Sequence, residues 1–144
     1  GELDLTMHGP SKKLEVEPYS KRRAVYGYID RQNISPTLNS FDFANPNIHA
    51  PQRVETTVPQ QALFAFNHPF VIERSAKLAK KAFDSKATNP SSQVEFLYRQ
   101  VLSRDPRKDE IKLGAEFLTN DAKLANLEDL AQTLLVSNEF FFTD

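Results

Sequence analysis

The residues best suited to chemistry form a cluster of aromatic and cationic side chains within residues 19–31 of this 144-residue chain. Tyrosine rings can stack on sugars, and guanidinium groups bind carboxylates and other anions through paired hydrogen bonds. This spacing predicts a binding surface for a polysaccharide or a protein partner, with burial of the same tyrosines in a core as the competing interpretation. The candidate surface consists of Tyr19, Arg22, Arg23, Tyr26, Tyr28 and Arg31.

A second candidate is a polar cluster in the loop around Pro46. Its side-chain oxygens are of the kind that bind calcium, but the twelve-residue EF-hand register with a central Gly and a terminal Glu is missing. An Asx-rich turn is therefore the favoured interpretation. The cluster consists of Asp42, Asn45, Asn47 and His49.

Catalytic motifs are not evident in the sequence. The three histidines, His8, His49 and His68, are far apart, and neither H-E-x-x-H nor G-x-S-x-G nor S-x-x-K occurs. The four glycines form no phosphate-binding loop. We therefore assign no catalytic, metal-binding or cofactor-binding residue, and we expect His68 to serve in hydrogen bonding at a helix junction.

A hydrolytic enzyme domain remains an alternative hypothesis. In that case the N-terminal half would bring a histidine, His8 or His49, close to Asp42, Arg53 or Glu55. It predicts a deep polar pocket in which those side chains converge.

Composition narrows the classes of partner. Eighteen Lys and Arg residues against 19 Asp and Glu residues give a net charge of -1, which provides no field for nucleic acid. The chain has no cysteine, which excludes disulfides, thiolate metal sites and covalent haem attachment within it.

No apolar run in the sequence is long enough to cross a membrane. Because the chain starts at Gly1 without a methionine, we expect it to be a domain excised from a larger protein.

The N-terminal segment, residues 1–56, is predicted to be irregular because prolines interrupt it at five positions. The alternation in Leu14–Glu17 resembles a short strand. Residues 23–31 favour one or two helical turns with Tyr26 and Ile29 facing inward, although a strand also fits. Ser35 followed by proline predicts a short helix over 36–41. The prolines are Pro10, Pro18, Pro36, Pro46 and Pro51.

Residues 57–144 carry repeated helix-start signals and helical periodicity. Capping residues and prolines predict five helices. The first covers 58–66, begins after a capping box at Thr57 and ends at Asn67 in the left-handed conformation. The others are 69–83, a helix that starts at Pro90, a helix that starts at Asp105-Pro106, and a helix capped by Asn126. The predicted fold is a mainly α single domain over residues 1–144, with an antiparallel helical bundle in the C-terminal half. The expected apolar stripes include Ala79, Ala82, Val94, Leu97, Gly114, Leu118, Leu127, Ala131 and Leu134.

Several segments together resemble one known family, the planctomycete cytochrome-associated C-terminal domain (PSD domain), a domain of unknown function. The most specific is the run from Thr56 to Phe70 (TTVPQQALFAFNHPF), and the resemblance covers nearly the whole chain. His8 occupies a position where the family pattern has a second glycine. The other segments are Leu3–Ser11, Arg22–Tyr26, Phe41–Pro46, Leu102–Pro106 and Ser137–Phe140.

The resemblance implies a location rather than a mechanism. It implies a large exported protein, periplasmic or at the cell surface, in which this domain follows another uncharacterised domain and often a c-type haem module. It transfers no catalytic residue to this chain, and any haem would belong to another part of the parent protein. The leading hypothesis is thus a non-catalytic scaffold or interaction module that contacts neighbouring domains.

Overall fold

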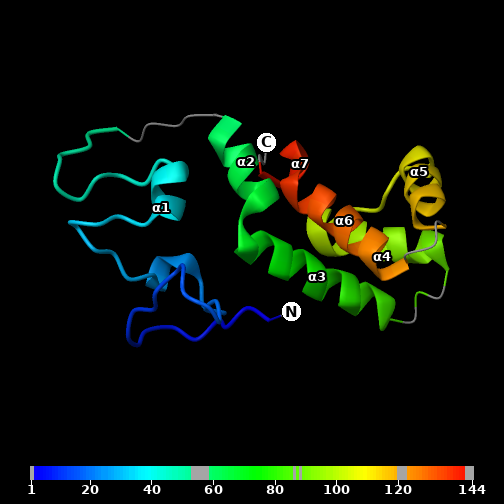
Figure 1. Ribbon diagram of the computed structural model, residues 1–144, viewed down its shortest axis with the longest axis horizontal. Coiled ribbons are helices and arrows are strands. Elements are labelled where there is room, and N and C mark those ends of the chain that lie inside the picture. The colour runs from blue at the N-terminus through cyan, green and yellow to red at the C-terminus, as the bar shows by residue number, and fades with distance from the viewer. Residues whose placement is uncertain (1, 53–58, 86, 88, 120–122, 142–144) are drawn as a thin grey trace. The chain divides into compact units, whose positions relative to one another are not determined.

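The computed structural model describes residues 2–52, 59–85, 87, 89–119 and 123–141, and the chain divides into two compact units, residues 1–64 and 65–144. Each unit is described by itself. The described residues contain seven α-helices, one 3-10 turn and no strand, which confirms the predicted mainly α fold (Figure 1). Within these ranges, no helix combines the length and apolar character needed to cross a bilayer.

The first unit is mostly irregular chain held by a few hydrogen bonds. It contains a 3-10 turn, Ala24–Tyr26, and the short helix α1, Pro36–Ser40. As predicted, Ser35 begins α1, since its hydroxyl accepts a hydrogen bond from the Leu38 N–H. Two isolated parallel bridges, between Asp4 and Arg22 and between Lys12 and Gly27, join segments that are far apart in sequence.

One prediction for this unit is wrong and a second is confirmed only in part. Leu14–Glu17 is not a strand, because the parallel pairing stops at the Lys12–Tyr28 hydrogen bond and the chain then bends. Of the one or two helical turns predicted over 23–31, one forms, the 3-10 turn Ala24–Tyr26. Val25 is 75% exposed and Ile29 is also exposed, so these side chains do not face a core.

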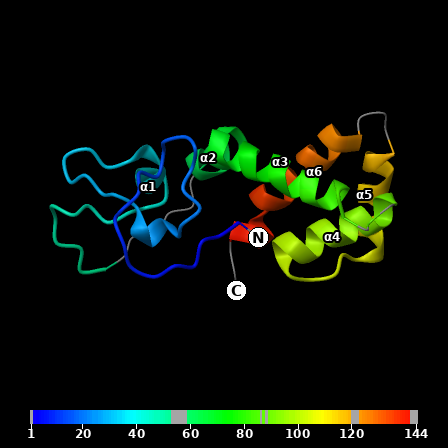
Figure 2. The ribbon, with the colours of Figure 1, turned by 90° about the horizontal axis from the view of Figure 1, so that it is seen from below.

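The second unit is a helical bundle. After α2 (Pro59–Asn67), which crosses the division between the units, come α3 (Pro69–Phe83), α4 (Pro90–Leu102), α5 (Lys108–Leu118), α6 (Lys123–Val136) and α7 (Asn138–Phe141). Helix α3 packs along α6 more extensively than any other pair of described helices, and the two lie side by side in Figures 1 and 2.

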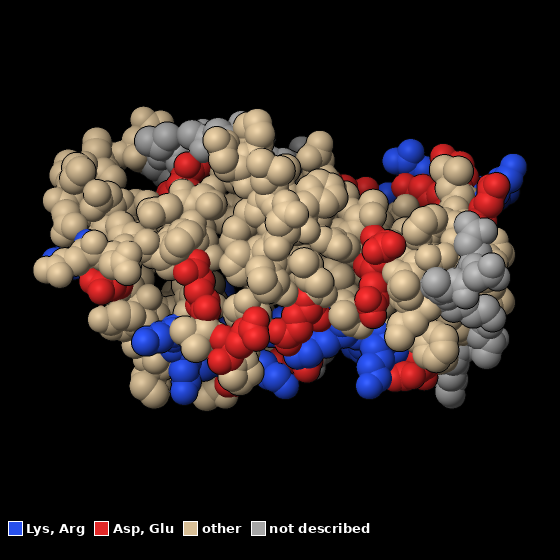
Figure 3. All heavy atoms as spheres, in the orientation of Figure 1, with Lys and Arg blue, Asp and Glu red and all other residues tan. Residues whose placement is uncertain are grey.

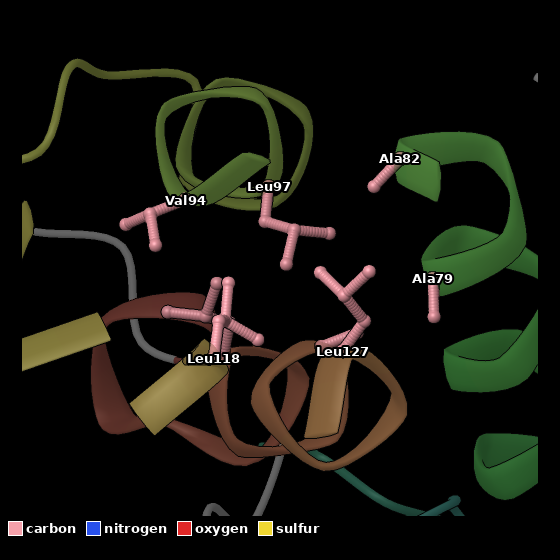
Figure 4. Packing of buried hydrophobic residues seen from close by; sticks show 8 residues of the cluster. Ala79, Ala82, Val94, Leu97, Leu118 and Leu127 are labelled. Atoms are coloured by element: carbon pink, nitrogen blue, oxygen red, sulfur yellow. The ribbon is translucent and has the colours of Figure 1, made fainter. Parts of the chain in front are cut away.

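The core of the bundle contains the predicted apolar stripes. Val94 and Leu97 of α4 point towards Leu118 of α5 and Leu127 of α6 (Figure 4). At Gly114 of α5, an added Cβ would lie 2.7 Å from Val94 Cγ2, so a glycine permits the close approach of α4 and α5. The buried cluster consists of Ala79, Ala82, Val94, Leu97, Leu118, Leu127, Ala131 and Leu134.

Capping chemistry agrees with the predictions at α4. The Asn89 side chain accepts from the Ser92 N–H at 2.8 Å, and Pro90 is the first helical residue. The predicted capping box at Thr57 lies outside the described residues.

Three helix boundaries differ from the predictions. Helix α5 begins at Lys108 rather than at Pro106, because Glu110 accepts the Arg107 N–H and sets the start there. Helix α6 already contains Asn126, whose amide donates to the Phe117 carbonyl instead of capping the helix. Asn67 is not among the residues with positive φ; α2 ends where His68 starts to cap α3.

Candidate functional site

Arg22, predicted to lie on a binding surface, is engaged by the chain itself. Its guanidinium donates to the carbonyls of Thr6 (3.0 Å), His8 and Pro10 (3.2 Å). The same group lies 4.1 Å from the centre of the Tyr26 ring, a cation–π contact. The Arg22 side chain therefore holds the backbone of the N-terminal loop, residues 6–10.

The loop bound by Arg22 adopts an unusual backbone conformation. Gly9 has φ 102° and His8 has φ 65°, both in the left-handed region that favours glycine. A Cβ at position 9 would lie 3.4 Å from Arg22 Nη1, an ordinary van der Waals contact, so it is the positive φ and not lack of space that favours glycine there. The positive φ at position 8 fits the second glycine that the resemblance implies there, and it makes His8 a residue held in an unfavourable conformation with its side chain exposed.

The other residues of the predicted binding surface separate into two groups. Tyr19 is buried in the first unit, and Tyr26 is half-buried beneath Arg22. Arg23, Tyr28 and Arg31 are exposed.

The predicted polar cluster lies partly in an Asx turn. Asn45 Oδ1 accepts from the Asn47 N–H (2.9 Å), and the Asn47 amide donates to the Arg31 carbonyl (3.0 Å). Asp42 has φ 54°. Among the described residues, no three His, Asp or Glu side chains come together as a metal site would require.

A cavity of about 740 Å³ lies beside this turn. Its walls are mainly apolar, with Asp42 and Asn45 on its rim; His49 is exposed and does not line it. Arg53 and Glu55, invoked for the hydrolytic alternative, lie outside the described residues. The main apolar side chains of the wall are Leu38, Phe41, Phe43 and Ile48.

A smaller hollow of about 280 Å³ lies beside Tyr28 in the same unit. Polar side chains converge on it from three segments: Lys13 and Glu15, then Asp30, then Asn33. Glu15 is held in place because its Oε1 accepts from the Thr37 N–H (2.8 Å) and from the hydroxyls of Ser35 and Thr37. Sequence reasoning singled out Tyr28 but missed these partners, which lie in separate segments of the chain.

The corner between α2 and α3 presents apolar side chains to solvent. Phe66, Phe70 and Ile72 are 54%, 37% and 47% exposed. His68 caps the start of α3, because its Nδ1 accepts from the Phe70 N–H, as expected for a histidine at a helix junction. Gln132 of α6 donates to the Phe66 carbonyl (2.7 Å) and anchors the end of α2 on the bundle.

Charged side chains on the bundle are mixed in sign. Lys77, Lys80 and Lys81 lie on the predicted solvent side of α3, and Lys77 pairs with Glu73 at 2.5 Å. On the face shown in Figure 3, acidic and basic residues are intermixed rather than separated by sign. Among the described residues on this face, no extended patch of one sign is present that would steer a polyanion.

A charged network that sequence analysis missed joins three elements of the bundle. Arg104, in the turn after α4, donates to both oxygens of Glu110 (2.8 Å each) and to Glu139 of α7 (2.5 and 2.8 Å). The hydrogen bonds from Arg104, followed by that from the Arg107 N–H, lower the pKa of Glu110 to about 2. Hydrogen bonding to Arg104 also lowers the pKa of Glu139.

Arg104 and Glu139 belong to two of the segments that carry the family resemblance, Leu102–Pro106 and Ser137–Phe140. The structure brings these two segments together at one ion pair. A family model described as PSD1, protein of unknown function (DUF1553), matches residues 1–118. The chain belongs to the PSD1 family. No curated protein and no solved structure matches it.

Membership in PSD1 confirms the family predicted from the sequence. Both glycine-favouring positions of the Arg22 loop and the α2–α3 corner lie within the matched residues. Glu139 lies beyond them, so the Arg104 network extends from the matched part of this PSD1 chain into α7.

Proposed function

We propose that this PSD1 chain is a non-catalytic interaction module of a larger exported protein, and that its α2–α3 corner docks on a neighbouring domain of that protein. The observation that supports the proposal is the outward placement of Phe66, Phe70 and Ile72 within seven residues. Exposed aromatic and aliphatic side chains are common in protein–protein contacts. Phe70 and Ile72 are two positions apart on α3 and face different sides of it, so a partner that covers both extends around the helix.

Local hydrogen bonds hold the backbone of the corner in place. His68 caps the start of α3, and Gln132 of α6 donates to the carbonyl of Phe66 at the end of α2. A rigid surface loses little conformational entropy when it binds. Covering the exposed parts of three side chains of this size would contribute about 3 kcal/mol, which is appreciable for a contact within one chain.

The cellular setting is proposed from the family resemblance. A location in the periplasm or at the cell surface, in a protein that also carries c-type haem, fits that resemblance. The haem would be held by another part of the protein, because this chain contains no cysteine for covalent attachment.

Site-specific photo-crosslinking in the full-length protein tests the proposal. A photoreactive phenylalanine analogue replaces Phe66, which keeps an aromatic ring at the corner. The matched control carries the same analogue at Lys81, which is exposed on the polar side of α3.

After irradiation, we expect position 66 to crosslink to a peptide from outside residues 1–144, with a yield several times that of position 81. Equal yields at the two positions, or crosslinks from position 66 only to residues 1–144, would refute docking through this corner.

A further inference from the structure

We infer that the hollow beside Tyr28 binds one sugar unit of a neutral polysaccharide. This site lies in the first unit and does not involve the α2–α3 corner. The side chains that carry the inference are Lys13, Leu14, Glu15, Tyr28, Asp30 and Asn33.

The backbone builds the hollow by aligning two segments. Lys12 accepts the Tyr28 N–H (2.8 Å) and donates to the Tyr26 carbonyl (3.0 Å), so the segments leave this point in parallel. Leu14 packs directly over Gly27, where an added Cβ would lie 2.8 Å from the leucine side chain. Leu14 thereby supplies an apolar part of the lining of the hollow.

Tyr28 provides the aromatic surface. Its side chain is 53% exposed, and it forms no hydrogen bond with the described part of the chain. An exposed ring at a hollow can stack on the C–H face of a pyranose while its hydroxyl stays in contact with water.

The polar groups around the ring suit sugar hydroxyls. Three hydrogen bonds from Ser35 and Thr37 hold the Glu15 carboxylate, and Asp30 is oriented by accepting the Gln32 N–H (2.9 Å). Carboxylates accept from hydroxyls, whereas an amide and an ammonium donate to them.

The donors of the hollow are available for a ligand. The side chains of Asn33 and Lys13 make no hydrogen bond to the residues that the structure describes. Because they sit beside the acceptors Glu15 and Asp30, the hollow offers both partners that adjacent hydroxyls need.

Charge and size restrict the ligand. The carboxylates of Glu15 and Asp30 both line the hollow, so a sulfate or uronic-acid group placed against them would be repelled, whereas neutral hydroxyls would not. The volume of about 280 Å³ is just below the range of about 300 to 1,000 Å³ typical of small-molecule sites. It therefore suits one ring, with the rest of the polymer outside.

The inference is tested by adding oligosaccharides to the whole chain and following the NMR chemical shifts of its backbone amides. Cellohexaose and mannohexaose are the neutral probes, and an oligo-alginate is the acidic probe. We expect shifts in residues 13–16 and 28–35 with a neutral probe at millimolar concentration, and little change with the alginate. Tyr28→Ala should weaken binding about tenfold, and Tyr28→Phe should retain it because the ring remains. Phe117→Ala, which removes an exposed aromatic ring of α5, is the matched control and should bind like the wild type.

Three results would overturn the inference. They are no shifts with either neutral probe, equal affinity in the Tyr28→Ala variant while its spectrum stays folded, and tighter binding of alginate than of the neutral sugars. None of these results bears on crosslinking at Phe66, so the two proposals stand or fall separately.

Discussion

Replacing Glu110 with glutamine would test the Arg104 network directly. Glu110 accepts two hydrogen bonds from Arg104 and one from the Arg107 N–H, and it sits in the first turn of α5. Glutamine has nearly the same shape but no charge, so it keeps the packing and removes the charge-assisted part of the interaction.

The structure sets the size of the effect. The pKa of Glu110 falls from 4.5 to about 2 because of Arg104 first and the Arg107 N–H second. That difference corresponds to about 3 kcal/mol as an upper limit. The Arg104 and Glu110 side chains are 27% and 21% exposed, so water screens the pair, and we expect a loss of about 1 to 2 kcal/mol at pH 7.

The pH dependence of unfolding distinguishes this charge effect from a loss of packing. A carboxyl whose pKa is lower in the folded state stabilises fully above its unfolded pKa, and this stability is lost as the pH falls through the folded pKa. Urea unfolding at pH 7, 4.5, 3 and 2 should therefore show a difference between wild type and Glu110→Gln that is largest at pH 7. The difference should fall below half at pH 3 and nearly vanish at pH 2.

The control is Glu116→Gln, a neutralisation of an exposed acid on the same helix that makes no ion pair with a described residue. It should change the unfolding free energy by no more than about 0.5 kcal/mol at any of these pH values. A deficit in Glu110→Gln that is equal at pH 7 and pH 2, or no deficit at pH 7, would refute the electrostatic reasoning.

Three further variants probe other contacts. Gly114→Ala places a methyl group against the stiff side chain of Val94, and overpacking of about 1 to 3 kcal/mol should exceed the gain of about 1 kcal/mol in helix preference, lowering the urea midpoint. Asn89→Ala removes the cap of α4 and should cost about 1 kcal/mol in the same assay. Arg22→Ala removes the donor to three carbonyls of the loop 6–10, so limited proteolysis of this loop should become several-fold faster. Arg22→Lys should restore little protection, because one ammonium group cannot replace the several N–H donors of the guanidinium.

An unchanged urea midpoint for Gly114→Ala or Asn89→Ala would contradict the helix contacts described above. An unchanged rate of cleavage in Arg22→Ala, or full protection by lysine, would contradict the role of Arg22 in holding the loop.

Short-range signals made the starts of two helices predictable. Asn89 followed by proline begins α4, and Ser35 followed by proline begins α1, because a cap satisfies backbone groups only two or three residues away. The same reasoning failed at Asp105-Pro106, where Arg107 and Glu110 place the start of α5 two residues later.

The candidate sites were less predictable, because their parts lie far apart along the chain. The sequence pointed to Tyr28 as an exposed aromatic, but not to its neighbours Glu15 and Asn33. It also indicated that Arg22 could bind carboxylates, whereas the structure pairs it with backbone carbonyls of an earlier loop. Spacing in sequence carries little information on such encounters.

By itself, the sequence determined the helical class, the apolar stripes of the bundle and the PSD1 family. Helical periodicity and capping depend on residues close together in the chain, and the family is recognised from the order of the residues alone. Only the tertiary structure decided which polar groups meet. Arg104 and Glu139 are 35 residues apart in sequence, yet the packing of α4 against α7 brings them within hydrogen-bonding distance. The physical reason is that folding closes long loops through the burial of apolar side chains, and the positions of charged groups follow from that packing.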